Sequence, residues 1–162
     1  MKRSSLNGTW ILDKSRGDEW KMNNYLATMD VDPLAIEAHE KGEMEHDTIH
    51  TITLTDRSVE IIKQSRVNNQ LRVQLVLGEE SADYLPPGNR PKKSLARSDH
   101  LGHVEIVSSL LTVNGMAQVK DVKNLVQESD EKSVMVQELT ITNEATGKSC
   151  TTIRHFLPYN DE

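Results

Sequence analysis

Most of this chain consists of short segments in which apolar and polar side chains alternate, each ending at a turn signal. The clearest segment has Leu71, Val73, Leu75 and Leu77 on one face and Arg72 on the other. Side chains along a strand point alternately to opposite faces, so this pattern is typical of a half-buried strand. The alternation therefore predicts a fold made mainly of strands.

Segments of this kind recur from one end of the chain to the other. The expected strands cover residues 10–12, 48–55, 57–67, 71–77, 82–85, 93–98, 103–111, 117–127, 133–142 and 149–157. Asn68-Asn69 and Asn114-Gly115 favour tight hairpin turns. Short connections favour antiparallel pairing of consecutive strands, and closing such a meander removes its exposed edges. The sequence therefore predicts an all-β fold, a ten-stranded antiparallel up-and-down β-barrel with room inside for a small ligand.

Residues 17–42 interrupt the alternation with a helical period. Met22, Leu26 and Met29 recur at spacings of four and three, and the acidic pair at 18–19 favours a helix start before them. We therefore expect a first helix in this region.

A second, short helix is expected immediately afterwards. Asp32 is a typical N-cap residue, and Pro33 favours the first helical position. We expect this helix to end at Gly42. The pair forms a helix–turn–helix lid inserted after the first strand.

Composition limits the class of protein further. The 162 residues fit a single domain spanning 1–162, and only 36% are hydrophobic and 4% aromatic, which we interpret as a thin or hollow core. A net charge of −6 argues against general binding to nucleic acid, which needs a basic surface. No stretch approaches the ~18 consecutive apolar residues of a membrane helix, so we expect no stable membrane insertion. Cys150 is the single cysteine, which favours a reducing compartment and a cytoplasmic location.

The element order resembles the intracellular fatty-acid-binding protein family, which includes the cellular retinoid-binding proteins. The resemblance covers essentially the whole chain in element order. Its local matches are Gly8-Thr9-Trp10, the first helix at 22–31, Leu77-Gly78-Glu79-Glu80, the basic run at 89–94 and the closing strand at 150–156. Met22 stands where the family has Phe, Asp30 replaces its Gly, and Phe156 stands where Tyr is usual. These departures suggest a distant member of the calycin superfamily.

The resemblance implies a ligand-binding role for residues near the end of the chain. In the family, an Arg-x-Tyr pair on the last strand faces the cavity and binds the ligand carboxylate. Arg154 and Phe156 are similar to this pair, and Lys123 lies near the family's second inward cation. A guanidinium matches the geometry of a carboxylate. The alternative is that Arg154 and Lys123 are solvated surface residues.

The resemblance also assigns roles to apolar residues. Met22, Leu26, Met29 and Leu34 would form the underside of the lid, although such a stripe is also typical of ordinary packing. Trp10 is expected to fill the closed end of the barrel.

The resulting hypothesis is a cytoplasmic, monomeric carrier that binds one small hydrophobic ligand, such as a fatty acid or retinoid, with Arg154 orienting its polar end. We expect no catalysis, no cofactor and no metal, because motifs for nucleophilic catalysis and phosphate binding are lacking. His46 and His50 have the spacing of a helical metal pair, but along a strand that spacing is ~13 Å, too far to share an ion. Two alternatives remain: an enzyme or haem-binding protein on a related barrel that uses a cavity histidine, and a scaffold whose barrel is filled by side chains.

Overall fold

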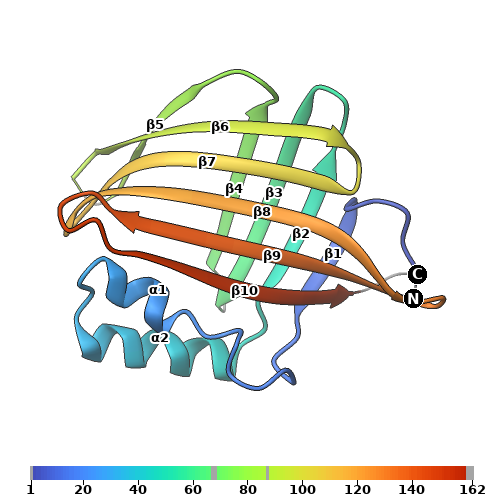
Figure 1. The fold of residues 1–162 in the computed structure, drawn as a ribbon, viewed down its shortest axis with the longest axis horizontal. Helices are drawn as coiled ribbons and strands as arrows, with labels where there is room; N and C mark the ends of the chain where they lie inside the picture. Colours follow the sequence, from blue (N-terminus) through green and yellow to red (C-terminus); the bar gives the residue numbers. More distant parts are fainter. Residues whose placement is uncertain (1, 67–68, 87, 160–162) are drawn as a thin grey trace.

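The computed structural model describes residues 2–66, 69–86 and 88–159. Within these residues the chain forms ten strands with two helices after the first strand (Figure 1). The strands are β1 (Gly8–Leu12), β2 (Ile49–Leu54), β3 (Ser58–Arg66), β4 (Asn69–Val76), β5 (Ser81–Leu85), β6 (Arg90–His100), β7 (His103–Thr112), β8 (Gly115–Ser129), β9 (Lys132–Asn143) and β10 (Ser149–Pro158), and the helices are α1 (Asn23–Thr28) and α2 (Pro33–Glu45).

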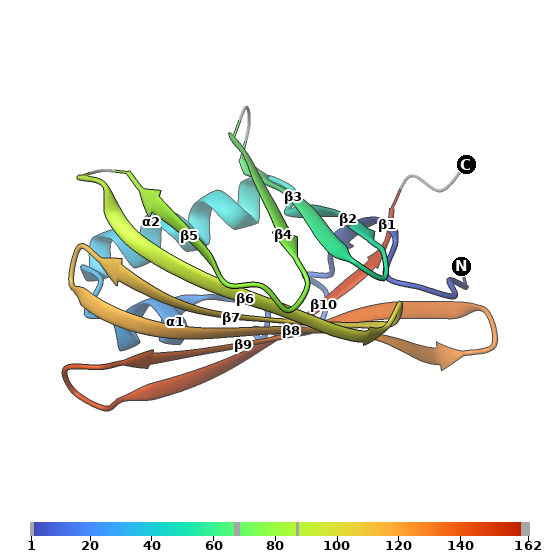
Figure 2. The same ribbon diagram turned by 90° about the horizontal axis from the view of Figure 1, so that it is seen from above.

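All ten strands belong to one antiparallel sheet that curls into a nearly closed barrel. Their order is β4-β3-β2-β1-β10-β9-β8-β7-β6-β5, so consecutive strands are neighbours and β1 pairs with β10. The two ends of the sheet are β4 and β5, which Figure 2 shows diverging from one another. The backbone N–H of Gly78, between these strands, donates to the Ala96 carbonyl on β6 at 2.8 Å. The predicted all-β barrel with a helix pair after its first strand is confirmed.

The predicted strands are confirmed in number and order, and the structure lengthens several of them. β6 begins at Arg90 rather than at residue 93, because backbone pairing continues through polar residues that the apolar pattern does not mark. The predicted hairpin between β7 and β8 is also confirmed, with its turn at Val113-Asn114, one residue before the predicted Asn114-Gly115. Thr112 pairs with Gly115, whose φ of +118° is a conformation that glycine adopts without steric cost. The turn predicted at Asn68 lies outside the described residues.

The first helix is much shorter than its period predicts. α1 covers only Asn23–Thr28, and its N-cap residue Met22 makes no side-chain capping hydrogen bond. The preceding chain instead forms turns stabilised by its own side chains. Asp13 accepts a hydrogen bond from Arg16 Nε at 2.9 Å, and Trp20 Nε1 donates to the Gly17 carbonyl at 3.1 Å. These local bonds compete with helix formation, and the expected helix start at the acidic pair is wrong.

The second helix begins as predicted and ends later. The Asp32 side chain accepts a hydrogen bond from the Leu34 backbone N–H at 2.8 Å, which confirms the N-cap. The helix continues past Gly42, whose carbonyl accepts a hydrogen bond from the His46 N–H at 3.0 Å. The next residue, Glu43, is bonded to the barrel, and that contact outweighs the low helix propensity of glycine.

One end of the barrel interior is filled by apolar side chains. The buried cluster there comprises Leu6, Trp10, Leu12, Trp20, Ile52, Leu54, Val59, Ile61, Leu75, Ala96, Val104, Ile106, Met135 and Phe156. Trp10 is fully buried in it and donates from Nε1 to the Leu6 carbonyl at 2.8 Å, which agrees with a packing role. Of the helices in the described residues, none is both long and apolar enough to cross a bilayer.

Candidate functional site

A cavity of about 400 Å³ lies inside the barrel, between the two helices and the strands. Its lining residues are Met22, Tyr25, His39, Glu43, Thr48, His50, Lys63, Ser65, Gln70, Leu71, Gln137, Leu139 and Arg154. Most of these side chains are polar, although the hypothesis of a hydrophobic ligand leads one to expect an apolar lining. The polar side chains come from inward-facing strand positions and from both helices.

Two smaller pockets adjoin this cavity. One of about 180 Å³ shares Tyr25, Lys63 and Leu139 with it. Another of about 180 Å³ shares Tyr25, Leu110 and Val119 with the second and has a mainly apolar lining. The interior therefore offers a polar region and, on the far side of Tyr25, an apolar one.

Arg154 points into the barrel from β10 and is only 5% exposed. Its Nη2 donates to Glu43 Oε2 at 2.5 Å, and its Nε donates to the Trp20 carbonyl at 3.1 Å. Thr48 Oγ1 donates to the same Glu43 oxygen at 2.8 Å. Glu43 is the one buried residue of α2, so the lid helix is attached to the barrel by a carboxylate. The guanidinium that the resemblance assigned to a ligand is thus neutralised by the chain itself.

Lys123 is also buried and paired. It lies on β8 and donates to Asp121 Oδ2 at 2.8 Å, and Gln137 on β9 donates from Nε2 to Asp121 Oδ1 at 3.2 Å. Burial opposes ionisation of Asp121, but the neighbouring Lys123 and Lys63 ammonium groups and these hydrogen bonds prevail and lower its pKa. Gln137 is the cross-strand neighbour of both Arg154 and Lys123, so these three side chains form one row across β10, β9 and β8.

His50 and Lys63 are cross-strand partners on β2 and β3 and both line the cavity. Burial, together with the charges of Lys123, Lys63 and Arg154, places the pKa of His50 well below its usual value, so the imidazole is neutral at physiological pH. Burial and the nearby Lys123 ammonium lower the pKa of Lys63 to about 8, against an attraction from Asp121. Lys63 remains mostly protonated at neutral pH.

Three buried side-chain atoms of this lining have no hydrogen-bond partner in the described part of the chain: Glu43 Oε1, His50 Nδ1 and Gln137 Oε1. Glu43 Oε1 lies 3.8 Å from His39 Nδ1, beyond hydrogen-bond range. Buried polar atoms are satisfied in the great majority of cases, so these atoms are available to hydrogen-bond with a molecule in the cavity.

The remaining predicted site residues fall in different places. Phe156 is fully buried and stacks on the His50 ring at a centroid distance of 4.6 Å. Met22 lines the polar cavity, whereas Leu26 and Met29 line the apolar pocket. Leu34 is 77% exposed, so its expected place under the lid is wrong. It lies in the first turn of α2, where residues 33–35 are all exposed.

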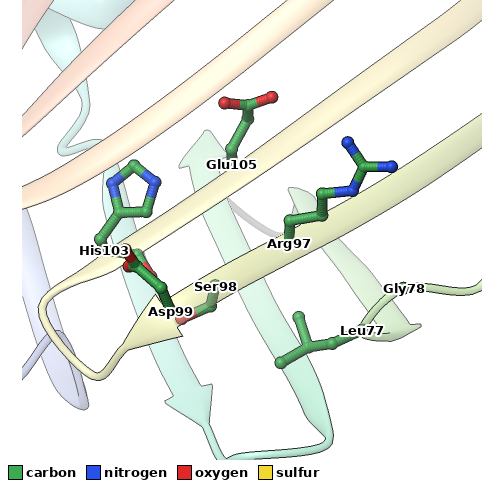
Figure 3. Close-up of a pocket in the computed structure, with 7 residues that line it drawn as sticks. All are labelled: Leu77, Gly78, Arg97, Ser98, Asp99, His103 and Glu105. Atoms are coloured by element: carbon green, nitrogen blue, oxygen red, sulfur yellow. The ribbon is translucent and has the colours of Figure 1, made fainter.

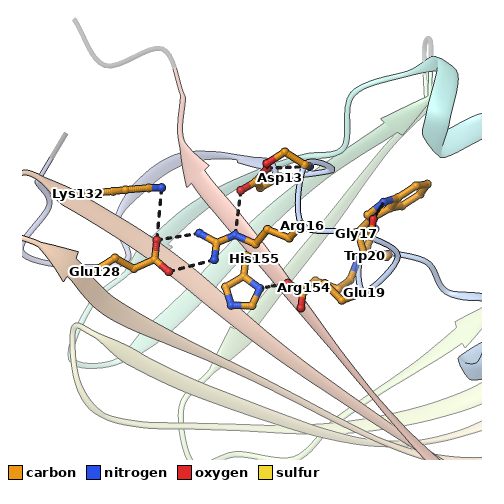
Figure 4. Close-up of polar contacts among 10 residues, drawn as sticks. Asp13, Arg16, Gly17, Glu19, Trp20, Glu128, Lys132, Arg154 and His155 are labelled. Atoms are coloured by element: carbon orange, nitrogen blue, oxygen red, sulfur yellow. Dashed lines mark hydrogen bonds and ion pairs between the residues drawn. The ribbon is translucent and has the colours of Figure 1, made fainter.

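Polar contacts fix the segment between β1 and α1 against the barrel wall (Figure 4). Arg16 donates two hydrogen bonds to the Glu128 carboxylate on β8, at 3.1 and 2.8 Å. Glu19 Oε1 lies 2.5 Å from His155 Nδ1 on β10. Arg154, on the same strand, donates both to the Trp20 carbonyl and to Glu43 of α2. One side chain therefore attaches both this segment and α2 to the barrel.

A second hollow, of about 490 Å³, lies outside the barrel wall (Figure 3). It is lined by Leu77 and Gly78 and by polar residues of β6 and β7 such as Arg97, Asp99 and Glu105. Arg97 and Asp99 are exposed, so charges there are solvated. We therefore take the interior cavity as the candidate site.

The histidines do not gather into a metal site. No group of three or more His, Cys, Asp or Glu side chains placed to hold a metal ion occurs among residues 2–66, 69–86 and 88–159. His46 is the C-cap of α2 and His50 faces inward from β2.

Sequence reasoning missed Glu43, Asp121, Gln137, Lys63 and His50 as lining or supporting residues. For Lys63 a signal exists, because it shares its strand face with Val59 and Ile61, both buried. Asp121 similarly shares a face with Lys123. For Glu43 no local signal exists, since its partner is 111 residues away in the sequence.

The fold is similar to that of solved lipid-carrier structures. A Schistosoma mansoni fatty acid binding protein in complex with arachidonic acid is 15% identical with a TM-score of 0.65, covering 97% of this chain and 98% of that one. Human cRBP IV is 20% identical with a TM-score of 0.59, covering 97% and 100%. A zebrafish ileal bile acid-binding protein complexed with cholic acid is 14% identical with a TM-score of 0.62, covering 96% and 100%. No protein-family model matches the sequence, and no curated protein is similar to it in sequence. The predicted resemblance is confirmed at the level of the fold.

Proposed function

We propose that this protein is a carrier that binds one small hydrophobic ligand inside its barrel. The observation that carries the proposal is the interior cavity of about 400 Å³, lined by unpaired polar atoms and adjoined by smaller pockets. Ligand pockets typically measure ~300–1,000 Å³, so a small molecule is a suitable occupant. Similarity in fold to proteins named for binding fatty acids and bile acids supports a binding role rather than a catalytic one.

The lining suggests how such a ligand would lie. Its apolar part would occupy the pocket beside α1, with Leu26 and Met29, where burial contributes ~25 cal/mol per Å² removed from water. Its polar end would face Met22, Arg154 and the polar cavity. In this arrangement Arg154 would orient the polar end indirectly. It holds Glu43 by one carboxylate oxygen, and the other oxygen, Oε1, would contact the ligand.

Phe156 and Lys123 would act from behind the lining. Phe156 supports the His50 ring, and Lys123 fixes Asp121 and through it the amide of Gln137. We further propose that the protein works as a cytoplasmic monomer, in keeping with its one unpaired cysteine, Cys150.

The test is a titration of delipidated protein with a fluorescent fatty acid, followed by displacement with non-fluorescent fatty acids and retinoids. We expect saturable binding at one site per chain. Arg154→Ala should weaken it, whereas Arg72→Ala, on an exposed side chain of β4, should not. Far-UV circular dichroism of each variant controls for unfolding. Binding that never saturates, or that no candidate ligand displaces, contradicts the proposal.

A further inference from the structure

The cavity contains a cation that is not bonded to any carboxylate among the described residues. Two cationic side chains line it, and of these Arg154 is paired with Glu43. Lys63 has no hydrogen-bond or ion-pair partner among the described residues. The like charges of Lys123, Lys92 and Arg154 act on it, and so does the opposite charge of Asp121.

The charges around Lys63 leave the site positive. Lys63, Lys92, Lys123 and Arg154 are cationic, whereas Asp121 and Glu43 are anionic. Both carboxylates are already bonded to Lys123 and Arg154 respectively. Lys63 lines the cavity and has no carboxylate bonded to it, so an incoming anion would be attracted most directly by its ammonium group.

The same cavity also presents acceptors that need a donor. Gln137 must turn its Nε2 toward Asp121, because its carbonyl oxygen would repel that carboxylate. This fixed orientation leaves Gln137 Oε1 buried and unpaired, and Glu43 Oε1 is unpaired as well. A simple carboxylate offers only acceptor atoms, so it would leave both oxygens unsatisfied.

We propose that the ligand is a lipid anion with a hydrogen-bond donor beside its charged group, bound with the anion at Lys63 and the donor at Gln137. A 2-hydroxy fatty acid and an N-acyl amino acid both have this head-group chemistry. The inference rests on the carrier function proposed above and adds the class of head group. It assigns the ligand's charge to Lys63 rather than to Arg154, which holds Glu43.

The test is calorimetric titration of delipidated protein with hexadecanoate, 2-hydroxyhexadecanoate and hexadecanol. We expect the hydroxy acid to bind at least about tenfold more tightly than hexadecanoate, the factor that corresponds to one satisfied hydrogen bond. Lys63→Met should weaken both acids by about tenfold or more and leave hexadecanol unchanged. Lys93→Met, on an exposed side chain of β6, should change neither acid.

Gln137→Leu separates the donor contact from the charge contact. It should remove the preference for the hydroxy acid. This preference is the ratio of the affinities for the two acids measured on the same variant, so a general loss of packing, which weakens both acids alike, would leave the ratio unchanged. Equal affinity of the wild type for both acids, or unchanged affinities in Lys63→Met, would overturn the inference while leaving the carrier function standing. Failure of all three lipids to bind the wild type would overturn both.

Discussion

The pair formed by Glu43 and Arg154 should be strongly coupled, because both charges are buried. Both side chains are about 6% exposed, and their atoms lie 2.5 Å apart. Removing one partner of a buried pair costs about 3–5 kcal/mol, because the other charge stays buried without compensation. Glu43→Gln and Arg154→Met should therefore each lower the free energy of unfolding by about 3 kcal/mol or more.

The double variant removes both charges and so should cost much less than the sum of the single variants. We expect a coupling free energy of about 2 kcal/mol or more from urea unfolding of the four proteins. The exposed pair Arg72 and Glu60, on β4 and β3, is the matched control, with side chains 64% and 22% exposed. Its coupling should lie within about 1 kcal/mol. Additive effects at Glu43 and Arg154, with a coupling no larger than that control, would refute the idea that this pair attaches α2 to the barrel.

Two further predictions follow from single groups. The pKa of Lys63 is about 8 in the folded chain and 10.5 for an unperturbed lysine. Between these two pH values the unfolded chain binds more protons than the folded one, so this group makes stability rise with pH. Wild type should gain as much as about 3 kcal/mol over Lys63→Met across this range in urea unfolding, and parallel pH profiles would contradict the shift. Asp32→Ala should lower stability by about 1 kcal/mol through loss of the N-cap of α2, whereas Glu37→Ala, exposed on the same helix, should have little effect; equal losses would contradict the cap.

The barrel could be predicted from the sequence because its information is local. Alternation along each strand fixes which side chains face inward, and short turns fix which strands pair. The pattern places His50, Ile52 and Leu54 on one face, and all three are buried. The same rule places Lys63 inside with Val59 and Ile61, yet residue type alone suggests a surface lysine.

The helices were harder to predict because tertiary contacts decide their bounds. The spacing of Met22, Leu26 and Met29 indicates a long first helix, but residues 17–20 form turns, in which Trp20 Nε1 donates to the Gly17 carbonyl. In α2 the residue that contacts the barrel is Glu43, in a helix whose other residues are all partly or fully exposed. A glutamate on a polar helix gives no indication that it is buried, because its partner Arg154 is distant in the sequence.

The low hydrophobic content has a different cause from the one that composition alone suggests. At one end the barrel is filled with apolar side chains, so the interior is not hollow throughout. At the other end, positions that would be apolar in an oily cavity are occupied by charged or hydrogen-bonding residues, among them Lys63, Asp121, Lys123 and Gln137. Burying such groups is costly unless each is paired, and most are paired within the chain. Among the described residues, three side chains with an unpaired buried atom, Glu43, His50 and Gln137, line one cavity. On the carrier function proposed above, these groups, rather than the apolar volume, would select the polar end of the ligand.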